Sequence, residues 1–143
     1  MATFKAIKEI FFPILKGEPV VDLDNKGFTV IQDISATEVG YLNFSIPDDF
    51  GSLATAELEL IEFLPVAGGS ISVASNFGSE GEAFDVHFHT KSSTTGQVND
   101  QLDRFDVSAV IPVIVAGDMG GLVIRTGENQ KIRGLRFKYN PAF

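Results

Sequence analysis

The only two histidines of the chain lie two positions apart, with an aspartate two positions before the first. Asp85, His87 and His89 would share one face of a strand, which places the two imidazoles about 7 Å apart. Two imidazoles and a carboxylate are ligands that zinc or iron accept in proteins. A working site also needs ligands from other elements, and the sequence nominates none. We therefore expect a polar outward strand face and no metal, with a metal shared at a subunit interface as the alternative.

A second group has oxygen-rich side chains of the kind that calcium prefers. Its members are Asn99, Asp100, Asp103 and Asp106. An EF-hand loop requires a glycine at its turn and a closing glutamate, and this spacing supplies neither. We expect these residues to be solvated.

Three glutamates, Glu57, Glu59 and Glu62, raise the question of glycoside hydrolysis, which uses a pair of carboxyl groups on either side of the scissile bond. Here the acids follow one another along a single expected strand. Acids in that arrangement usually form the wet face of the strand, and this is the interpretation we favour.

Motifs for nucleophilic hydrolysis and for nucleotide binding are missing from the sequence. It contains no Gly-x-Ser-x-Gly elbow and no Gly-Lys-Ser/Thr phosphate loop. Gly117, Gly120 and Gly121 follow an expected helical turn and precede a strand, the reverse of the nucleotide-binding order, so we expect them to form a tight bend. The prediction is a protein that is not an enzyme, with no cofactor and no metal.

The composition of the chain narrows the classes of partner that it can bind. The chain has 143 residues, a net charge of −8 and no cysteine. An acidic protein repels phosphate, which argues against nucleic acid and against anionic membranes as partners. The lack of cysteine suits assembly in a reducing cytoplasm. Residues 1–15 contain lysines and Pro13 among their apolar residues, so we expect neither a signal peptide nor a membrane span there.

Short runs rich in Val, Ile, Phe and Thr alternate with Gly, Asp, Asn and Ser clusters along the whole chain. This pattern predicts an all-β fold, an antiparallel two-sheet sandwich of the jelly-roll kind. Expected strands cover residues 28–33, 39–46, 54–64, 71–77, 84–89, 105–107, 122–126 and 131–139, with a loop over 91–100 and a helical turn within 108–115. A helix over 53–64 is the alternative for that stretch, since Ala, Glu and Leu favour helix.

Alternation within these strands predicts which side chains form the core. The chain has thirteen Phe, two Tyr and no Trp, so phenylalanine should dominate that core or a subunit interface. The expected core residues are Phe44, Ile46, Leu58, Leu60, Phe84, Val86, Phe88, Leu122, Ile124, Leu135 and Phe137.

The opening segment carries much apolar surface before the first confident strand. We expect residues 1–27 to be an N-terminal arm or edge segment and residues 28–143 to be the sandwich domain. The segment either lies as an edge strand on its own sandwich or crosses to a neighbour, and we favour crossing. Its expected assembly residues are Phe4, Ile7, Ile10, Phe11, Phe12 and Ile14.

Three stretches resemble small phage virion β-sandwich proteins, among which capsid decoration and fibre-head proteins occur. They are residues 36–44 followed by 47–50, residues 116–125, and residues 134–139. The sequence departs from the family's pattern where Arg125 runs into Thr126, Gly127 and Glu128 in place of an Arg-Asp-Gly turn. The resemblance covers about residues 28–140.

This resemblance implies a jelly-roll-like fold, no active site and assembly on a particle. The expected function is that of a virion structural protein, a capsid decoration or fibre-head component made in the host cytoplasm. Its expected partners are further copies of itself, as a homotrimer, and a major capsid or other virion protein. The alternative is a carbohydrate-binding module or receptor-binding domain, which would need exposed Tyr or Trp.

Overall fold

The computed structural model describes residues 6–14, 20–22, 29–31, 40–62, 70–94, 101–126 and 130–143. These residues form ten strands and one short 3₁₀ helix, η1 (Ser108–Val110). The strands are β1 (Lys8–Pro13), β2 (Val20–Asp22), β3 (Thr29–Ile31), β4 (Gly40–Ser45), β5 (Phe50–Glu62), β6 (Ser70–Gly78), β7 (His87–Thr94), β8 (Gln101–Asp106), β9 (Met119–Thr126) and β10 (Gln130–Pro141).

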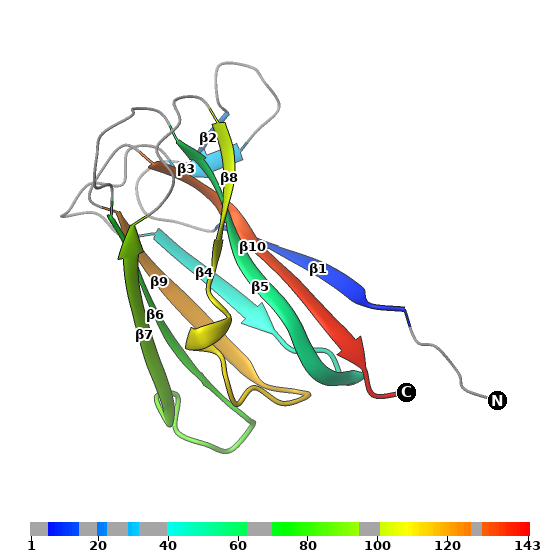
Figure 1. The fold of residues 1–143 in the computed structure, drawn as a ribbon. Coiled ribbons are helices and arrows are strands. Elements are labelled where there is room, and N and C mark those ends of the chain that lie inside the picture. The colour runs from blue at the N-terminus through cyan, green and yellow to red at the C-terminus, as the bar shows by residue number, and fades with distance from the viewer. Residues whose placement is uncertain are drawn as a thin grey trace.

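The strands form two antiparallel sheets that pack face to face (Figure 1). One sheet has six strands, ordered β2-β3-β10-β5-β8 with β1 also on β10, and the other is β4-β9-β6-β7. Four pairs are nested in the chain: β3 with β10, β4 with β9, β5 with β8, and β6 with β7. Nested pairs that alternate between two sheets define a rolled-up hairpin. The expected all-β jelly-roll sandwich is confirmed.

Most of the expected core residues are confirmed as buried between the sheets. Leu58 and Leu60 of β5 face Leu122 and Ile124 of β9 across the sandwich, and all four are at most 1% exposed. The other confirmed members are Phe44, Ile46, Leu135 and Phe137. Strand pairing of β5 with both β10 and β8 overrides the intrinsic helix preference of residues 53–62, and residues 63–64 of the expected stretch lie outside the described residues.

Three expected core residues, Phe84, Val86 and Phe88, are instead exposed, so that prediction was wrong. β7 begins at His87 and pairs Phe77 with His87 and Asn76 with Phe88. Because Phe77 is buried, this register turns the odd-numbered residues of β7 toward the core and the even-numbered ones outward. β7 also continues to Thr94, so residues 91–94 are strand where a loop was expected.

The 3₁₀ helix η1 lies where a helical turn was expected, and a buried serine ties it to the sheet. The Ser75 hydroxyl of β6 donates a 2.5 Å hydrogen bond to the Val110 carbonyl. The Ser108 hydroxyl accepts a 3.1 Å hydrogen bond from the Ala56 amide of β5. Since β5 and β6 belong to different sheets, η1 closes one end of the sandwich.

Candidate functional site: the outer face of the four-stranded sheet

The outer face of the sheet β4-β9-β6-β7 carries almost no charge. Among the outward positions that the structure describes on these four strands, Arg125 is the only charged residue. We call this surface the low-charge face. Its residues are Tyr41, Asn43, Ser45, Ser72, Ala74, Asn76, Gly78, Phe88, Thr90, Ser92, Met119, Gly121, Val123 and Arg125.

Large apolar side chains stand out from this face. Phe88 is 59% exposed and Tyr41 is 46% exposed. Phe84, in the turn that leads into β7, is 82% exposed. A folded protein normally keeps such side chains out of water, and exposed apolar groups gathered on one face mark contact surfaces. Met119 and Val86 extend the apolar surface at the same end of the sheet.

A surface hollow of about 420 Å³ lies at the end of the face where β6 turns toward β7. We call it the β6–β9 hollow. Its floor is backbone of β6 and β9, where glycines leave space. The lining residues are Asn76, Gly78, Ser79, Glu80, Gly81, Glu82, Ala83, Phe84, Met119, Gly120 and Gly121. The hollow therefore combines apolar lining residues, among them one aromatic ring, with two glutamates.

Hydrogen bonds hold the rim of the hollow in place. The Glu82 carboxylate accepts a 2.7 Å hydrogen bond from the Ser79 amide, which closes the turn after β6. The Ser79 hydroxyl donates a 2.6 Å hydrogen bond to the buried carboxylate of Asp118. Asp118 also accepts from the Val115 amide at 2.9 Å, so one carboxylate connects the two bends at this end of the sandwich.

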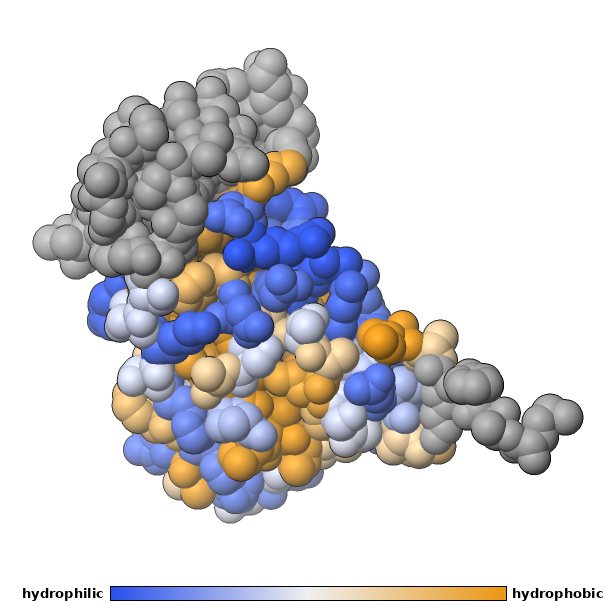
Figure 2. All heavy atoms as spheres, in the orientation of Figure 1, coloured by the Kyte–Doolittle hydropathy of each residue, from blue (hydrophilic) through white to orange (hydrophobic). Residues whose placement is uncertain are grey.

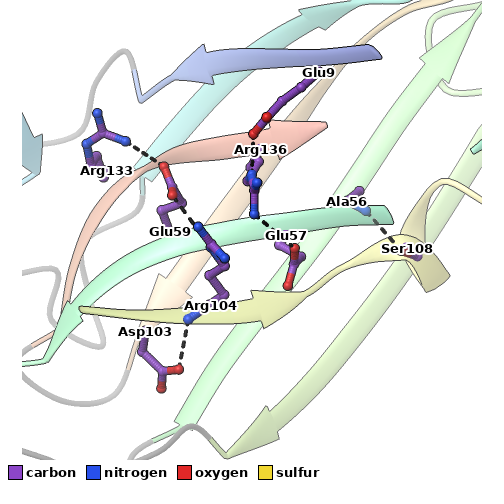
Figure 3. A network of polar contacts seen from close by, with 9 residues as sticks. All are labelled: Glu9, Ala56, Glu57, Glu59, Asp103, Arg104, Ser108, Arg133 and Arg136. Carbon is purple, nitrogen blue, oxygen red and sulfur yellow. Dashed lines mark hydrogen bonds and ion pairs between the residues drawn. The ribbon is translucent and has the colours of Figure 1, made fainter. Parts of the chain in front are cut away.

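The outer face of the other sheet has the opposite character, because ion pairs cross it from strand to strand (Figure 3). Arg136 of β10 pairs with Glu9 of β1 and lies 4.0 Å from Glu57 of β5. Glu59 of β5 lies 2.5 Å from Arg133 of β10 and 3.7 Å from Arg104 of β8. The acids predicted to lie on the wet side of their strand, Glu57 and Glu59, thus pair with neighbouring arginines. The side chain of Glu62 is outside the described residues.

In the view of Figure 2, hydrophilic residues dominate over β8 and β5, and apolar residues are more frequent lower in the view. On the charged face, the acidic and basic side chains pair with one another. The low-charge face has no comparable network among its described positions, so bringing a partner against it removes little charge from water.

The histidine pair does not lie on an outward polar face. His87 and His89 are half-buried at the edge of the sandwich and stack on the ring of Phe77, with ring centroids 5.0 and 5.9 Å apart. Asp85 lies in the preceding turn and is exposed. The expected shared face therefore does not form, because the carboxylate precedes the strand. Within the described residues, no three His, Cys, Asp or Glu side chains come together as a metal site.

The oxygen-rich group near β8 makes local hydrogen bonds to the backbone in its described part. The Asp103 carboxylate accepts a hydrogen bond from the Arg104 amide at 2.8 Å. The Asp106 carboxylate accepts one from the Ser108 amide at 2.8 Å, at the start of η1. Asn99 and Asp100 lie outside the described residues. Of the three glycines expected to form a tight bend, Gly117 does so, with a positive φ of 84° between η1 and β9, whereas Gly120 and Gly121 lie within β9.

The opening segment lies against its own chain over residues 8–13. β1 pairs with β10 from Lys8 opposite Tyr139 to Pro13 opposite Gly134. The Phe12 ring contacts Phe44 and Phe137 edge-on, at centroid distances of 6.4 and 6.2 Å. This is the edge-strand alternative within one chain. A strand exchanged between copies would make the same contacts, so the crossing arm stays a prediction.

The expected assembly residues of this segment divide between core and surface. Ile10, Phe12 and Ile14 pack on the core, whereas Ile7 and Phe11 are exposed. The guanidinium of Arg133 lies over the Phe11 ring, 4.5 Å from its centroid. Phe4 is outside the described residues.

Sequence reasoning missed the low-charge face, although a signal for it was present. In the expected strand 39–46, the residues that alternate with the core positions Phe44 and Ile46 are Tyr41, Asn43 and Ser45, and none of them is charged in a chain with 19 acidic residues. Because Phe88 was expected in the core, no large exposed aromatic side chain was assigned to the low-charge face from that strand. The pairing of β4, β9, β6 and β7 was needed to bring these positions together.

Comparison with known proteins adds no family to these observations: no protein-family model matches the chain, and no curated protein matches it. Among the described residues, no helix is long and apolar enough to cross a membrane.

Proposed function

We propose that this protein is a structural protein that works by protein–protein assembly, as a capsid decoration or fibre-head component of a virion. The observation that carries the proposal is the contrast between its two sheet faces. One is crossed by ion pairs, and the other exposes Phe88 and Tyr41 with a single charged residue among the described positions of its strands, and Phe84 is exposed in the turn beside it. A face of that kind is stable in water only at a cost, which binding to another protein removes.

Two further points support a virion. The jelly roll is an architecture that viral capsid proteins and lectins share, although a fold alone does not define a function. The resemblance of residues 28–140 to small phage virion proteins points to the first of these two classes. The proposal includes no catalytic role, no cofactor and no metal, and it locates the protein on the particle after synthesis in the host cytoplasm.

The test is to label the protein on particles. A tagged copy is expressed from its own locus, particles are purified on a density gradient, and the tag is located by electron microscopy. We expect regular labelling of the particle surface or of a fibre tip. Label that remains at the top of the gradient in every preparation would refute the proposal.

A matched pair of variants tests whether particle labelling depends on the low-charge face. Phe88→Ser removes an exposed ring from the low-charge face, and Leu102→Ser removes an exposed side chain from β8 on the other sheet. We expect the first to reduce labelling and the second to leave it unchanged. Equal labelling by both variants would assign docking to another surface.

Glycan binding is the second candidate, and a specific observation favours it. Tyr41 and Asn43 are exposed on the same face, with Asn76 two strands away. An aromatic ring beside amide groups can stack on a sugar and bond its hydroxyls. A glycan array probed with the wild-type protein and with Tyr41→Ala decides between the two. A specific ligand that Tyr41→Ala loses, without particle labelling, would replace the assembly proposal.

A further inference from the structure

We propose that the β6–β9 hollow is a receptor for Arg125 of a second copy of this chain, so that two copies pair through their low-charge faces about a twofold axis that crosses the strands. The inference rests on the proposed function and names one partner of that same face. The pair is a different assembly from the trimer that the family resemblance implies.

The chemistry of the hollow identifies its occupant. Glu80 and Glu82 supply negative charge, Phe84 supplies an aromatic face, and Met119 supplies apolar surface. This combination fits a side chain with a cationic end on an apolar stem. Arginine fits better than lysine, because its planar guanidinium stacks on rings and bonds carboxylates through two nitrogens.

The same face carries such a side chain at its opposite end. Arg125 is exposed, and among the described outward positions of the four strands it is the only charged one. It lies six residues along β9 from Met119, which is about 20 Å at the rise of a strand. This distance prevents Arg125 from reaching the hollow of its own chain.

Symmetry brings the two ends together. A twofold axis that lies between two facing sheets and crosses the strands reverses the strand direction of one copy relative to the other. Arg125 of each copy then meets the hollow of its partner, and each pair has two equivalent contacts. An axis parallel to the strands would instead oppose Glu80 and Glu82 to the same residues of the partner, which is repulsive.

The exposed apolar surface is of the size that such a pair needs. Phe84, Phe88 and Tyr41 are 82%, 59% and 46% exposed. At about 200 Å² for each aromatic side chain, these three provide roughly 370 Å². A stable interface buries about 800 Å² on each partner, so three side chains supply nearly half of it. Met119, Val123 and the backbone of the glycines add to this area.

The experiment is sedimentation velocity of the full chain over a concentration series, with a charge-exchange cycle. We expect wild type to shift from monomer to dimer as concentration rises. Arg125→Glu and Glu80→Arg should each raise the dissociation constant of the dimer at least about tenfold, because each leaves like charges facing one another. The double variant restores opposite charges, and we expect it to recover most of the lost affinity.

A third variant tests the hollow without changing charge. A Cβ at Gly121 would meet only ordinary contacts, at 3.4 Å from the Leu42 carbonyl oxygen and 3.5 Å from the Asn43 side-chain oxygen. Gly121→Leu should therefore fold, fill the hollow and abolish pairing. Leu102→Ser, on the other sheet, is the matched control and should pair as wild type does. Circular dichroism confirms that each variant is folded.

The outcomes separate this inference from the proposed function. A monomer at all concentrations, a trimeric mass, or a double variant no better than the single ones would each overturn the twofold pair. Particle labelling that persists in Arg125→Glu would leave the assembly role intact and show that the face binds another virion protein. If the tagged wild-type protein does not label particles, the assembly role is refuted, whatever oligomer the protein forms in solution.

Discussion

The phenol of Tyr139 donates a 2.7 Å hydrogen bond to the carboxylate of Asp49, which joins the last strand to the turn before β5. Lys8, at the start of β1, donates to the other oxygen of the same carboxylate. One acid thus connects β1, the turn and β10. The hydrogen bond from Lys8 and that from Tyr139 lower the pKa of the Asp49 carboxyl below its ordinary value. Burial, together with the bond to Asp49, raises the pKa of Tyr139.

This arrangement predicts that acid weakens the attachment of β1. The hydrogen bond from Arg136 also lowers the pKa of Glu9. A carboxyl whose pKa is lowered by folding stabilises the folded state above its unfolded pKa, and this contribution is lost as the pH falls through the folded pKa. With ordinary values near 4, the loss should begin below about pH 4 to 4.5. Urea unfolding at a series of pH values measures it.

The control for this pH dependence is Asp49→Asn, which keeps the shape of the side chain and cannot ionise. Its free energy of unfolding should be lower than that of wild type at neutral pH, and the gap should narrow in acid. A gap that stays constant across the acid range would show that Asp49 does not couple folding to protons.

Because the odd-numbered residues of β7 face the core, truncating Phe77 and truncating Phe88 should affect stability very differently. Phe77 is 1% exposed and packs against Phe44 and the histidine rings, so Phe77→Ala should lower the free energy of unfolding by about 3 to 5 kcal/mol. Phe88 pairs with Asn76, the residue before Phe77, and is 59% exposed on the other face, so Phe88→Ala should change stability by at most about 0.5 kcal/mol. Urea unfolding at low protein concentration, where copies do not pair, compares them. Similar losses would restore Phe88 to the core.

The same strand shows where sequence reasoning stops. Alternation located most of the strands and, for residues 40–46 and 54–60, also their buried sides, because polar and apolar residues separate cleanly there. In residues 84–89 the two sides are Phe84, Val86 and Phe88 against Asp85, His87 and His89. Hydrophobicity alone selects the first set, whereas the pairing of Phe77 with His87 turns His87 and His89 inward and leaves Asp85 in the preceding turn. Pairing partners are a long-range property that a local pattern does not contain.

The candidate site was harder to predict than the fold, for a related reason. Phe84 precedes β7, Asn76 lies in β6, and Gly121 and Arg125 lie in β9, and each alone is an ordinary residue of a β-sandwich. Only the sheet order places them on one face. The β1 contacts were partly foreseeable, since the apolar residues of the opening segment required cover, but their partners on β10 were not.

Two adjacent glycines of β9 should respond differently to one added methyl group. A Cβ at Gly120 would lie 2.5 Å from the Phe77 Cβ and 2.6 Å from the Asn76 carbonyl oxygen, so core or backbone must shift. Gly120→Ala should therefore destabilise the protein by about 1 to 3 kcal/mol, as overpacked cores do. Gly121→Ala meets only ordinary contacts and should be close to neutral. Thermal unfolding of both variants provides the comparison, and equal melting temperatures would contradict the packing described for Gly120.

The last prediction concerns whether β1 belongs to its own sandwich in solution. Glu9 and Lys138 are direct partners across β1 and β10, where side chains are close enough for a disulfide. Because the chain has no cysteine, Glu9→Cys with Lys138→Cys creates a single defined pair. If β1 pairs within one chain, with Glu9 opposite Lys138 of the same chain, oxidation gives a monomer on a non-reducing gel, with the cross-link inside that chain.

A covalently linked multimer that reduction returns to monomer would show instead that β1 crosses to a neighbouring copy. Glu9→Cys alone controls for accidental links, because its only possible disulfide joins two chains through the same position. The two topologies bury the same Phe12 contacts with Phe44 and Phe137 and so differ little in energy per chain. Protein concentration then determines the balance between β1 pairing within its own chain and β1 crossing to a neighbouring copy. Oxidation at low concentration should favour the cross-link within one chain, and oxidation at high concentration should favour links between chains.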